Sequence, residues 1–279
     1  MALLPQQWLD GVVAIGRLRP GTSTMWVASG FLYGYVVERD AKNEVVFYSF
    51  LVTNRHVLDE LNTVQLRFNP QGNDPAREFQ FDLRDCVFHP NPEIDIAVVP
   101  LAHHVLTEAG MQFSYFFSDR FTADRATMRT LGLSEGDGAF VLGFPMGIVG
   151  ETRSYVIVRF GAIARLRDCL AGTTTDFLLD APVLPGNSGG PVISRPELNA
   201  IIGTNIQAAA HLIGVVKSYV PYRDIAVSPQ TGNPRVIFEE NSGLTTVIPI
   251  DYVNEAIAAA QQQGLLQPPT EQETSPPTA

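Results

Sequence analysis

The sequence predicts an all-β protein built from antiparallel barrels. Short apolar runs recur along both halves of the chain, and clusters of glycine, proline, asparagine and aspartate separate them. This spacing is typical of barrels, whereas units of alternating strand and helix would need a helical pattern between successive strands. The 279 residues, of which 45% are hydrophobic and 17% charged, suffice for a large core.

Predicted strands fill most of the chain. In the first half, apolar and β-branched residues predict strands at 12–17, 24–35, 45–52, 63–68, 77–83 and 96–100. In the second half, the same signals predict strands at 139–142, 155–165, 177–179, 191–194, 200–206, 211–217 and 245–249.

Helical patterns are confined to two places. Residues 102–133 interrupt the strands, and 126–131 within them predict a short helix in a linker. Apolar residues at helical spacing predict a C-terminal helix over 250–263. The tail at 264–279 is rich in Pro, Thr, Gln and Glu and is predicted to be disordered. His103 and His104 in the linker have no cysteine or acidic partner at ligand spacing, so we expect no metal and no cofactor.

Charge and cysteine content limit the possible binding partners and the cellular compartment. The 19 basic and 29 acidic residues give a net charge of −10, which disfavours nucleic acid or an anionic membrane. With Cys86 and Cys169 alone, a disulfide-stapled secreted domain is not expected; one bridge stays open, and we interpret both as buried thiols. The N-terminus lacks a basic leader, and no apolar stretch approaches about 18 residues. We therefore expect a cytoplasmic protein with no membrane partner.

Glycines flank one serine in the run Pro-Gly-Asn-Ser-Gly-Gly-Pro at residues 185–191. Gly186 can adopt backbone angles that a side chain would forbid. The amides of Gly186 and Ser188 can then point at one place, where negative charge develops during acyl transfer. A tight turn without chemistry explains the same glycines, and this run alone does not decide between the two interpretations.

Two further segments bear on that choice. His56 stands in the polar step after the apolar run at 50–52, and Asp95 precedes the apolar run at 96–99. Taken singly, each is better explained as a core histidine or a strand-edge cap, because charged groups are seldom buried without a partner. Their order along the chain decides: histidine, aspartate and Ser188 follow the chymotrypsin order, which differs from that of subtilisin and the α/β-hydrolases.

Five segments together match one known family. They are residues 53–57, 95–98, 143–147, 180–191 and 247–251. Through them the chain resembles the trypsin-like serine peptidases of the chymotrypsin fold, and within these the bacterial HtrA-type protease domain without a PDZ domain. The matching segments are spread over nearly the whole chain.

This resemblance implies two antiparallel six-stranded β-barrels with a C-terminal helix. The N-terminal barrel would occupy residues 1–101, the inter-barrel linker 102–136, and the C-terminal barrel with its helix 137–263, followed by the tail at 264–279. His56, Asp95 and Ser188 would then meet between the barrels, where ligand sites are common.

The resemblance also assigns roles. Ser188 would attack a peptide carbonyl, His56 would carry the proton to the leaving amine, and Asp95 would fix the imidazole tautomer. The backbone amides of Gly186 and Ser188 would form the oxyanion hole. Asn187 stands where digestive enzymes have the aspartate that pairs with a clipped N-terminus. Activation is therefore expected to come from loop ordering, through a partner or self-association.

Substrate-binding residues are predicted on both sides of this loop. They are Pro182, Val183, Lys217, Ser218 and Tyr219. Pro182 stands where trypsin has the aspartate that attracts basic side chains, so no basic preference is expected. A bulky Tyr219 would narrow the pocket and favour small or medium aliphatic side chains. If Lys217 and Tyr219 point to solvent instead, this preference does not follow.

We therefore expect a bacterial, intracellular serine endopeptidase that acts on protein or peptide substrates through an acyl-enzyme. The alternative is a catalytically inactive trypsin-like scaffold that binds proteins. The complete triad and the glycine-shaped loop favour the enzyme, because a scaffold has no need of an oxyanion hole.

Overall fold

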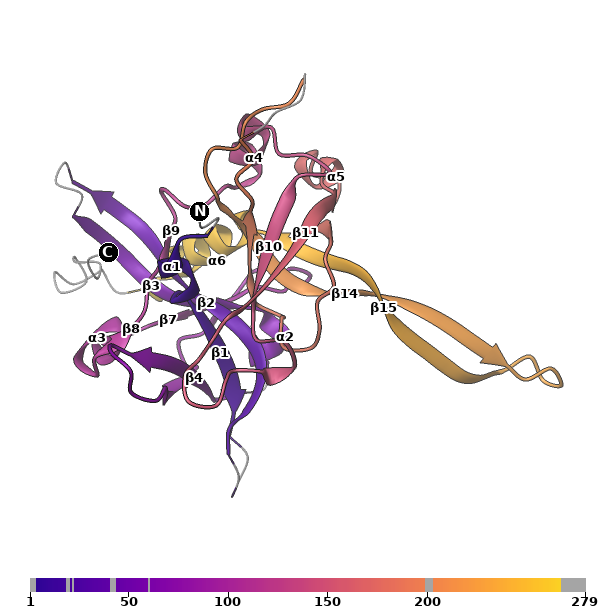
Figure 1. Cartoon of the computed structure of the whole chain (residues 1–279), viewed down its shortest axis with the longest axis horizontal. Helices are drawn as coiled ribbons and strands as arrows, with labels where there is room; N and C mark the ends of the chain where they lie inside the picture. The colour runs from indigo at the N-terminus through magenta and orange to yellow at the C-terminus, as the bar shows by residue number, and fades with distance from the viewer. Residues whose placement is uncertain are drawn as a thin grey trace.

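The computed structural model describes residues 4–18, 21, 23–40, 44–59, 61–198 and 203–266. Strands dominate this part of the chain (Figure 1). Up to Pro100, the elements are α1 (Gln6–Leu9), β1 (Val12–Arg17), β2 (Met25–Arg39), β3 (Val45–Thr53), α2 (Arg55–Leu58), β4 (Thr63–Pro70), β5 (Arg77–Asp82), β6 (Val87–Phe88) and β7 (Ala97–Pro100). The segment predicted to be a linker, 102–136, holds α3 (His103–Glu108), β8 (Met111–Gln112), β9 (Phe116–Phe117) and α4 (Arg125–Leu131), and its two strands pair with β4 and β2 of the N-terminal half.

The second half of the chain forms a closed six-stranded barrel. Its elements are β10 (Gly138–Gly143), the 3-10 turn η1 (Pro145–Gly147), β11 (Ile157–Arg165), α5 (Arg167–Leu170), β12 (Phe177–Asp180), β13 (Pro191–Ser194), β14 (Leu212–Val227), β15 (Pro234–Pro249) and α6 (Asp251–Gln262). The strands follow the order β10-β11-β12-β15-β14-β13, and every neighbouring pair is antiparallel. Inward-facing Val141, Val192 and Val247 are fully buried in its core.

The first half forms a curled sheet rather than a closed barrel. Its strand order is β5-β4-β1-β2-β3-β7-β6, with β8 added to β4 and β9 to β2. The end strands β5 and β6 do not pair with each other within the described ranges. Strand β6 has only two residues and β5 is largely exposed, so closing the ring would bury little apolar surface. The predicted all-β architecture is confirmed, with one barrel closed and the other open.

One core joins the two halves. Phe31 of the sheet packs in the same buried cluster as Phe140 of the barrel and Val253 of α6. The Tyr33 hydroxyl donates to Asn254 Oδ1 at 2.7 Å, which ties β2 to the same helix. Burial of apolar surface shared by both halves fixes how they sit together, and hence how residues from each can meet.

The structure departs from the predicted strands mainly in one hairpin. Strands β14 and β15 run far beyond the expected 211–217 and 245–249, and project away from the barrel (Figure 1). Pro221 and the polar residues near it indicate a loop in sequence, yet antiparallel pairing continues past them to Val227 and Pro234. The strand predicted at 200–206 is wrong for 203–206, which lie outside any strand, whereas 200–202 lie outside the described residues. The predicted helices correspond to α4 and α6, and the tail from 267 onward lies outside the description.

Candidate active site

Strand pairing brings His56 and Asp95 together. Strands β3 and β7 are antiparallel, with Thr53 opposite Ala97, so the residues after β3 meet those before β7. His56 Nδ1 lies 2.6 Å from Asp95 Oδ2, and the His56 backbone N–H donates to Asp95 Oδ1 at 3.0 Å. The Asn54 side chain donates to the Asp95 carbonyl at 2.9 Å. The carboxylate thus holds both the ring and the main chain of the histidine.

The environment of this pair suits proton transfer. The His56 side chain is 52% exposed, whereas that of Asp95 is 17% exposed. Because the carboxylate engages Nδ1, the neutral ring carries its proton there and leaves Nε2 as the acceptor. Asp95 therefore orients the imidazole from behind while the other nitrogen stays accessible.

The loop carrying Ser188 is anchored to the other half of the molecule by Ser29 on β2. The Ser29 N–H donates to the Ser188 carbonyl at 3.0 Å. The Ser29 hydroxyl donates to the Gly186 carbonyl at 2.6 Å and accepts from the Phe144 N–H at 2.8 Å. This completely buried serine fixes two peptide groups of the loop relative to β2.

The orientation of the Gly186 amide follows from a second contact. The Met146 N–H donates to the Pro185 carbonyl at 2.6 Å. Because a trans peptide directs its C=O and N–H in opposite directions, the Gly186 N–H points away from Met146. Gly186 has φ of +100°, and a Cβ there would lie 2.4 Å from the Phe144 oxygen. The Gly186 and Ser188 amides donate to no acceptor in the described part of the chain, so both are free to bind a ligand.

A pocket of about 320 Å³ brings these groups into one space. It is lined by His56, Asp95, Val183, Leu184, Pro185, Asn187, Ser188, Val216, Lys217, Ser218 and Tyr219. Four of the predicted substrate-binding residues thus lie along it. The fifth, Pro182, is exposed and does not line this pocket.

The Ser188 hydroxyl is not bonded to His56 in this conformation. Its Oγ donates to the Lys217 carbonyl at 3.3 Å instead. Hydrogen bonds to a nucleophile are often long or poorly aligned before a substrate binds, and rotation about χ1 redirects the hydroxyl.

Asn187 is completely buried next to the nucleophile. Its Oδ1 accepts a 3.1 Å hydrogen bond from the Leu184 N–H, and its Nδ2 has no partner in the described ranges. The side chain therefore braces the turn of its own loop, and as a neutral amide it cannot form an ion pair.

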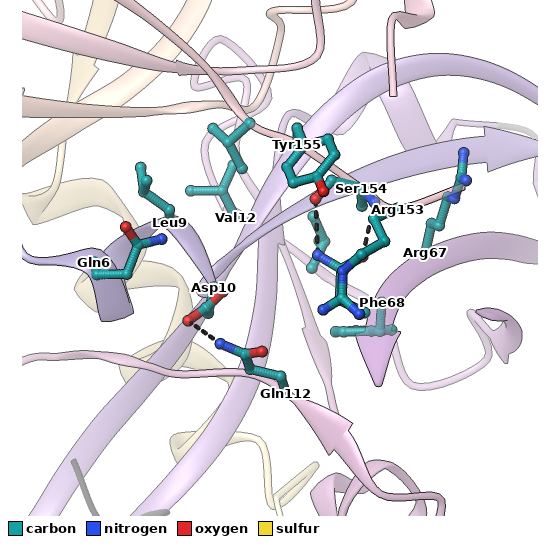
Figure 2. A pocket seen from close by; sticks show the side chains of 13 residues that line it. Gln6, Leu9, Asp10, Val12, Arg67, Phe68, Gln112, Arg153, Ser154 and Tyr155 are labelled. Atoms are coloured by element: carbon teal, nitrogen blue, oxygen red, sulfur yellow. Dashed lines mark hydrogen bonds between the residues drawn. The ribbon is translucent and has the colours of Figure 1, made fainter. Parts of the chain in front are cut away.

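A second pocket, of about 220 Å³, lies beside β1 and β4 (Figure 2). Its charged groups are already engaged. Gln112 donates to Asp10 at 2.9 Å, Arg67 donates to the carbonyls of residues 150 and 151, and Arg153 donates to the carbonyls of residues 70, 72 and 74. Burial raises the pKa of the Asp10 carboxyl, and the bond from Gln112 opposes this shift. No histidine lines this pocket, so its Ser154 hydroxyl has no imidazole base there.

Metal and membrane features are absent from what the structure describes. Its residues include no cluster of three or more His, Cys, Asp or Glu able to hold a metal ion. Among the helices within the described ranges, none is long and apolar enough to cross a membrane.

Comparisons with known proteins show the family to which the chain belongs. A model of the trypsin-like peptidase domain matches residues 28–203, and the chain belongs to this family, as the sequence predicted. No curated protein sequence matches the chain. Among solved structures, the chain is similar to the MamO protease domain from Magnetospirillum magneticum in its apo form. The identity is 15%, the match covers 89% of this chain and 96% of that one, and the TM-score is 0.44.

Proposed function

We propose that this protein is a serine endopeptidase with His56, Asp95 and Ser188 as its catalytic triad. The observation that carries the proposal is the 2.6 Å contact between His56 Nδ1 and Asp95 Oδ2 in the pocket that Ser188 also lines. A nucleophile, a base and a group that orients the base are the three components that acyl transfer needs.

These positions support the mechanism that we propose. Ser188 Oγ attacks the peptide carbonyl while His56 Nε2 takes its proton and then gives it to the leaving amine. The free amides of Gly186 and Ser188 stabilise the oxyanion of the tetrahedral intermediate. Loss of one such donor typically costs about 3 to 4 kcal/mol of transition-state stabilisation. Water, deprotonated by the same imidazole, then hydrolyses the acyl-enzyme.

The pocket wall supports an apolar substrate preference. Val183 and Val216 line the pocket, and Tyr219 occupies part of its wall. Small or medium aliphatic side chains before the scissile bond fit this lining. Activity would depend on the order of the loop that Ser29 and Met146 hold.

The state of the cysteines supports residence in a reducing compartment. Cys86 and Cys169 are both free, and burial raises the pKa of each thiol, to about 12 and about 11 respectively. Unpaired thiols are typical of cytoplasmic proteins. Of the two thiols predicted to be buried, Cys169 is, whereas Cys86 is only partly buried.

One observation favours the alternative of an inactive binding scaffold. The Ser188 hydroxyl bonds to the Lys217 carbonyl and not to the imidazole. If that arrangement persisted with a peptide in the pocket, His56 could not activate Ser188.

Cleavage of a peptide library by the purified chain separates these two functions. Ser188→Ala and His56→Ala should each lower kcat/KM by at least ~10³-fold. Ser23→Ala and His104→Ala are matched controls, because both residues are exposed and distant in sequence from the site, and should keep wild-type turnover. A Ser188→Ala variant retaining more than about a tenth of wild-type kcat/KM, a loss of under ~1.4 kcal/mol, would contradict the proposal.

A further inference from the structure

The end of the β14–β15 hairpin stands apart from the barrel (Figure 1). We call residues 221–241 the arm. Within it, β14 and β15 pair only with each other, from Pro221 opposite Asn241 to Val227 opposite Pro234. A two-stranded hairpin by itself is at best marginally stable in water. The arm therefore lacks the packing that stabilises β14 and β15 inside the barrel.

The arm exposes many large apolar side chains. Each of six is about half exposed: Tyr222, Ile225, Val227, Val236, Ile237 and Phe238. Because Ile225 lies directly opposite Ile237, and Asp224 opposite Phe238, apolar groups occur on both faces. A concentration of exposed apolar side chains on one projecting element marks an interaction surface.

Both outer edges of the arm are open. Strand β14 pairs with β13 only as far as Val215, and β15 pairs with β12 only from Leu244 onward. In the described part of the chain, the N–H and C=O groups on the outer sides of the arm therefore have no partner strand. An open edge of this kind accepts another extended strand.

We propose that the arm of a second copy of this chain pairs with the β15 edge, antiparallel, about a two-fold axis at Ile237. Ile237 then lies opposite Ile237 of the second copy, and Val236 opposite Phe238. One residue further from the axis, Arg235 lies opposite Glu239 of the second copy. The two-fold symmetry forms the same ion pair again on the other side of the axis. Apolar pairs at the centre and ion pairs at both ends make the edge complementary to itself.

The neighbouring arrangements lack this complementarity. An axis at Phe238 places Ile237 opposite Glu239, and an axis at Glu239 places two carboxylates opposite each other. On the β14 edge, an axis at Ile225 places Arg223 opposite Val227 and forms no ion pair. Among two-fold pairings of either edge with itself, only the axis at Ile237 on β15 places opposite charges across from each other, so charge complementarity selects it.

The paired edge ends at a residue that contacts the candidate active site. Glu239 accepts hydrogen bonds from the Tyr219 hydroxyl at 3.1 Å and from Arg223 Nε at 2.9 Å. Tyr219 lines the pocket that holds Ser188. Arm pairing would therefore order the carboxylate that positions this part of the pocket wall. This consequence rests on the proposed peptidase function, whereas the pairing itself does not.

Disulfide trapping tests the arrangement in the full chain. A cysteine at the two-fold axis lies within bonding distance of its own copy, because opposite residues of antiparallel strands have Cα atoms about 4.5 to 5.5 Å apart. Ile237→Cys should form a covalent dimer on mild oxidation. Ile225→Cys is the matched control. Ile225 is also exposed and lies directly opposite Ile237 in the hairpin, on the same face. In the proposed dimer, however, the two β15 strands lie between Ile225 and Ile225 of the second copy, so this variant should not cross-link.

Sedimentation velocity gives the second measurement and does not depend on catalysis. Wild type should form a dimer as its concentration rises, and Ile237→Lys, which places two ammonium groups at the axis, should raise the dissociation constant at least ~10-fold. Two results would overturn the proposal: cross-linking of Ile225→Cys in preference to Ile237→Cys, or a wild-type monomer at ~100 μM, well above the dissociation constants of specific interfaces.

Discussion

The hydroxyl of Ser29 donates a 2.6 Å hydrogen bond to the carbonyl of Gly186, and so joins the N-terminal sheet to the loop of the candidate oxyanion hole. The same hydroxyl accepts from the Phe144 N–H, and the Ser29 N–H donates to Ser188. His56 and Asp95 belong to the sheet and Ser188 to the barrel side. Ser29 therefore links the two parts of the proposed triad through one buried side chain.

Ser29→Ala should reduce activity beyond its effect on stability. Removal of the hydroxyl leaves a buried donor and a buried acceptor without a partner, so the free energy of unfolding should fall by about 1 to 3 kcal/mol. Without this hydrogen bond the backbone of Gly186 is less well positioned, so kcat/KM should also fall at least ~10-fold. This loss is smaller than that expected when an oxyanion-hole donor is removed completely.

Ser49→Ala is the control for this prediction. Ser49 is also buried and also donates to a carbonyl, that of Leu101, at 2.6 Å. Urea unfolding should show a comparable loss of stability in both variants, and only Ser29→Ala should lose activity. Equal kcat/KM values for the two variants would show that Ser29 has no positioning role.

Gly186→Ala should disable the oxyanion hole. The residue has φ of +100°, and a Cβ would lie 2.4 Å from the Phe144 oxygen and 2.9 Å from the Met146 nitrogen. The loop must shift to relieve this overlap, and kcat/KM should fall by ~10² to 10³. Gly136→Ala separates collision from backbone strain, because Gly136 has a similar φ of +97° with open space around its Cβ position. It should lose only stability, about 1 to 2 kcal/mol, and an equal loss of activity in both variants would contradict the prediction.

The chain order of His56, Asp95 and Ser188, together with the family resemblance, predicts that His56 and Asp95 meet, and the pairing of β3 with β7 brings them together in the structure. The roles of Ser29 and Met146 could not be predicted in this way. Ser29 lies 157 residues before Gly186, within an apolar run that shows no local motif. Met146 acts through its backbone N–H, which no side-chain pattern reveals.

The open N-terminal sheet and the long arm were also beyond the sequence signals. Closure depends on whether end strands are long enough to pair, and β6 proves to have only two residues. The arm keeps its pairing past Pro221, and both of its strands are edge strands, where proline is tolerated. The hydrophobic periodicity of one segment reveals neither whether a sheet closes nor how far two strands continue to pair.

Tyr219→Gly should widen the substrate preference. Removal of the ring enlarges a pocket that His56 and Ser188 also line, so larger apolar side chains should gain kcat/KM relative to small ones by at least ~10-fold. Tyr219→Phe separates size from hydrogen bonding, because it keeps the ring and loses only the bond to Glu239. Profiling both variants on one peptide library checks this; an unchanged preference in Tyr219→Gly would mean that the ring does not form the wall of the primary pocket.

Glu135 should make stability fall in acid. Partial burial raises the pKa of this carboxyl, but hydrogen bonds from the backbone N–H groups of Leu166 and Arg167 outweigh burial and lower the pKa from 4.5 to about 2. A carboxyl whose pKa is lower in the folded than in the unfolded chain stabilises the fold above pH 4.5, and this contribution is lost as the pH falls towards 2.

Urea unfolding of Glu135→Gln at several pH values measures this contribution. Between about pH 6 and pH 3, wild type should lose about 1 kcal/mol more stability than Glu135→Gln, since the side chain is partly solvent-screened. Glu108→Gln, at an exposed helical position, should follow wild type. Parallel pH profiles for wild type and Glu135→Gln would rule out this role.

The most direct test of the peptidase proposal is reaction of the purified full chain with a fluorophosphonate, followed by mass spectrometry to locate the adduct. Such reagents modify a serine whose hydroxyl is activated by a neighbouring base and whose adduct oxygen is held by an oxyanion hole. We expect one adduct, on Ser188, that is absent from Ser188→Ala and strongly reduced in His56→Ala. A wild-type chain that stays unmodified, or that reacts at another serine while Ser188 is free, would contradict the proposal.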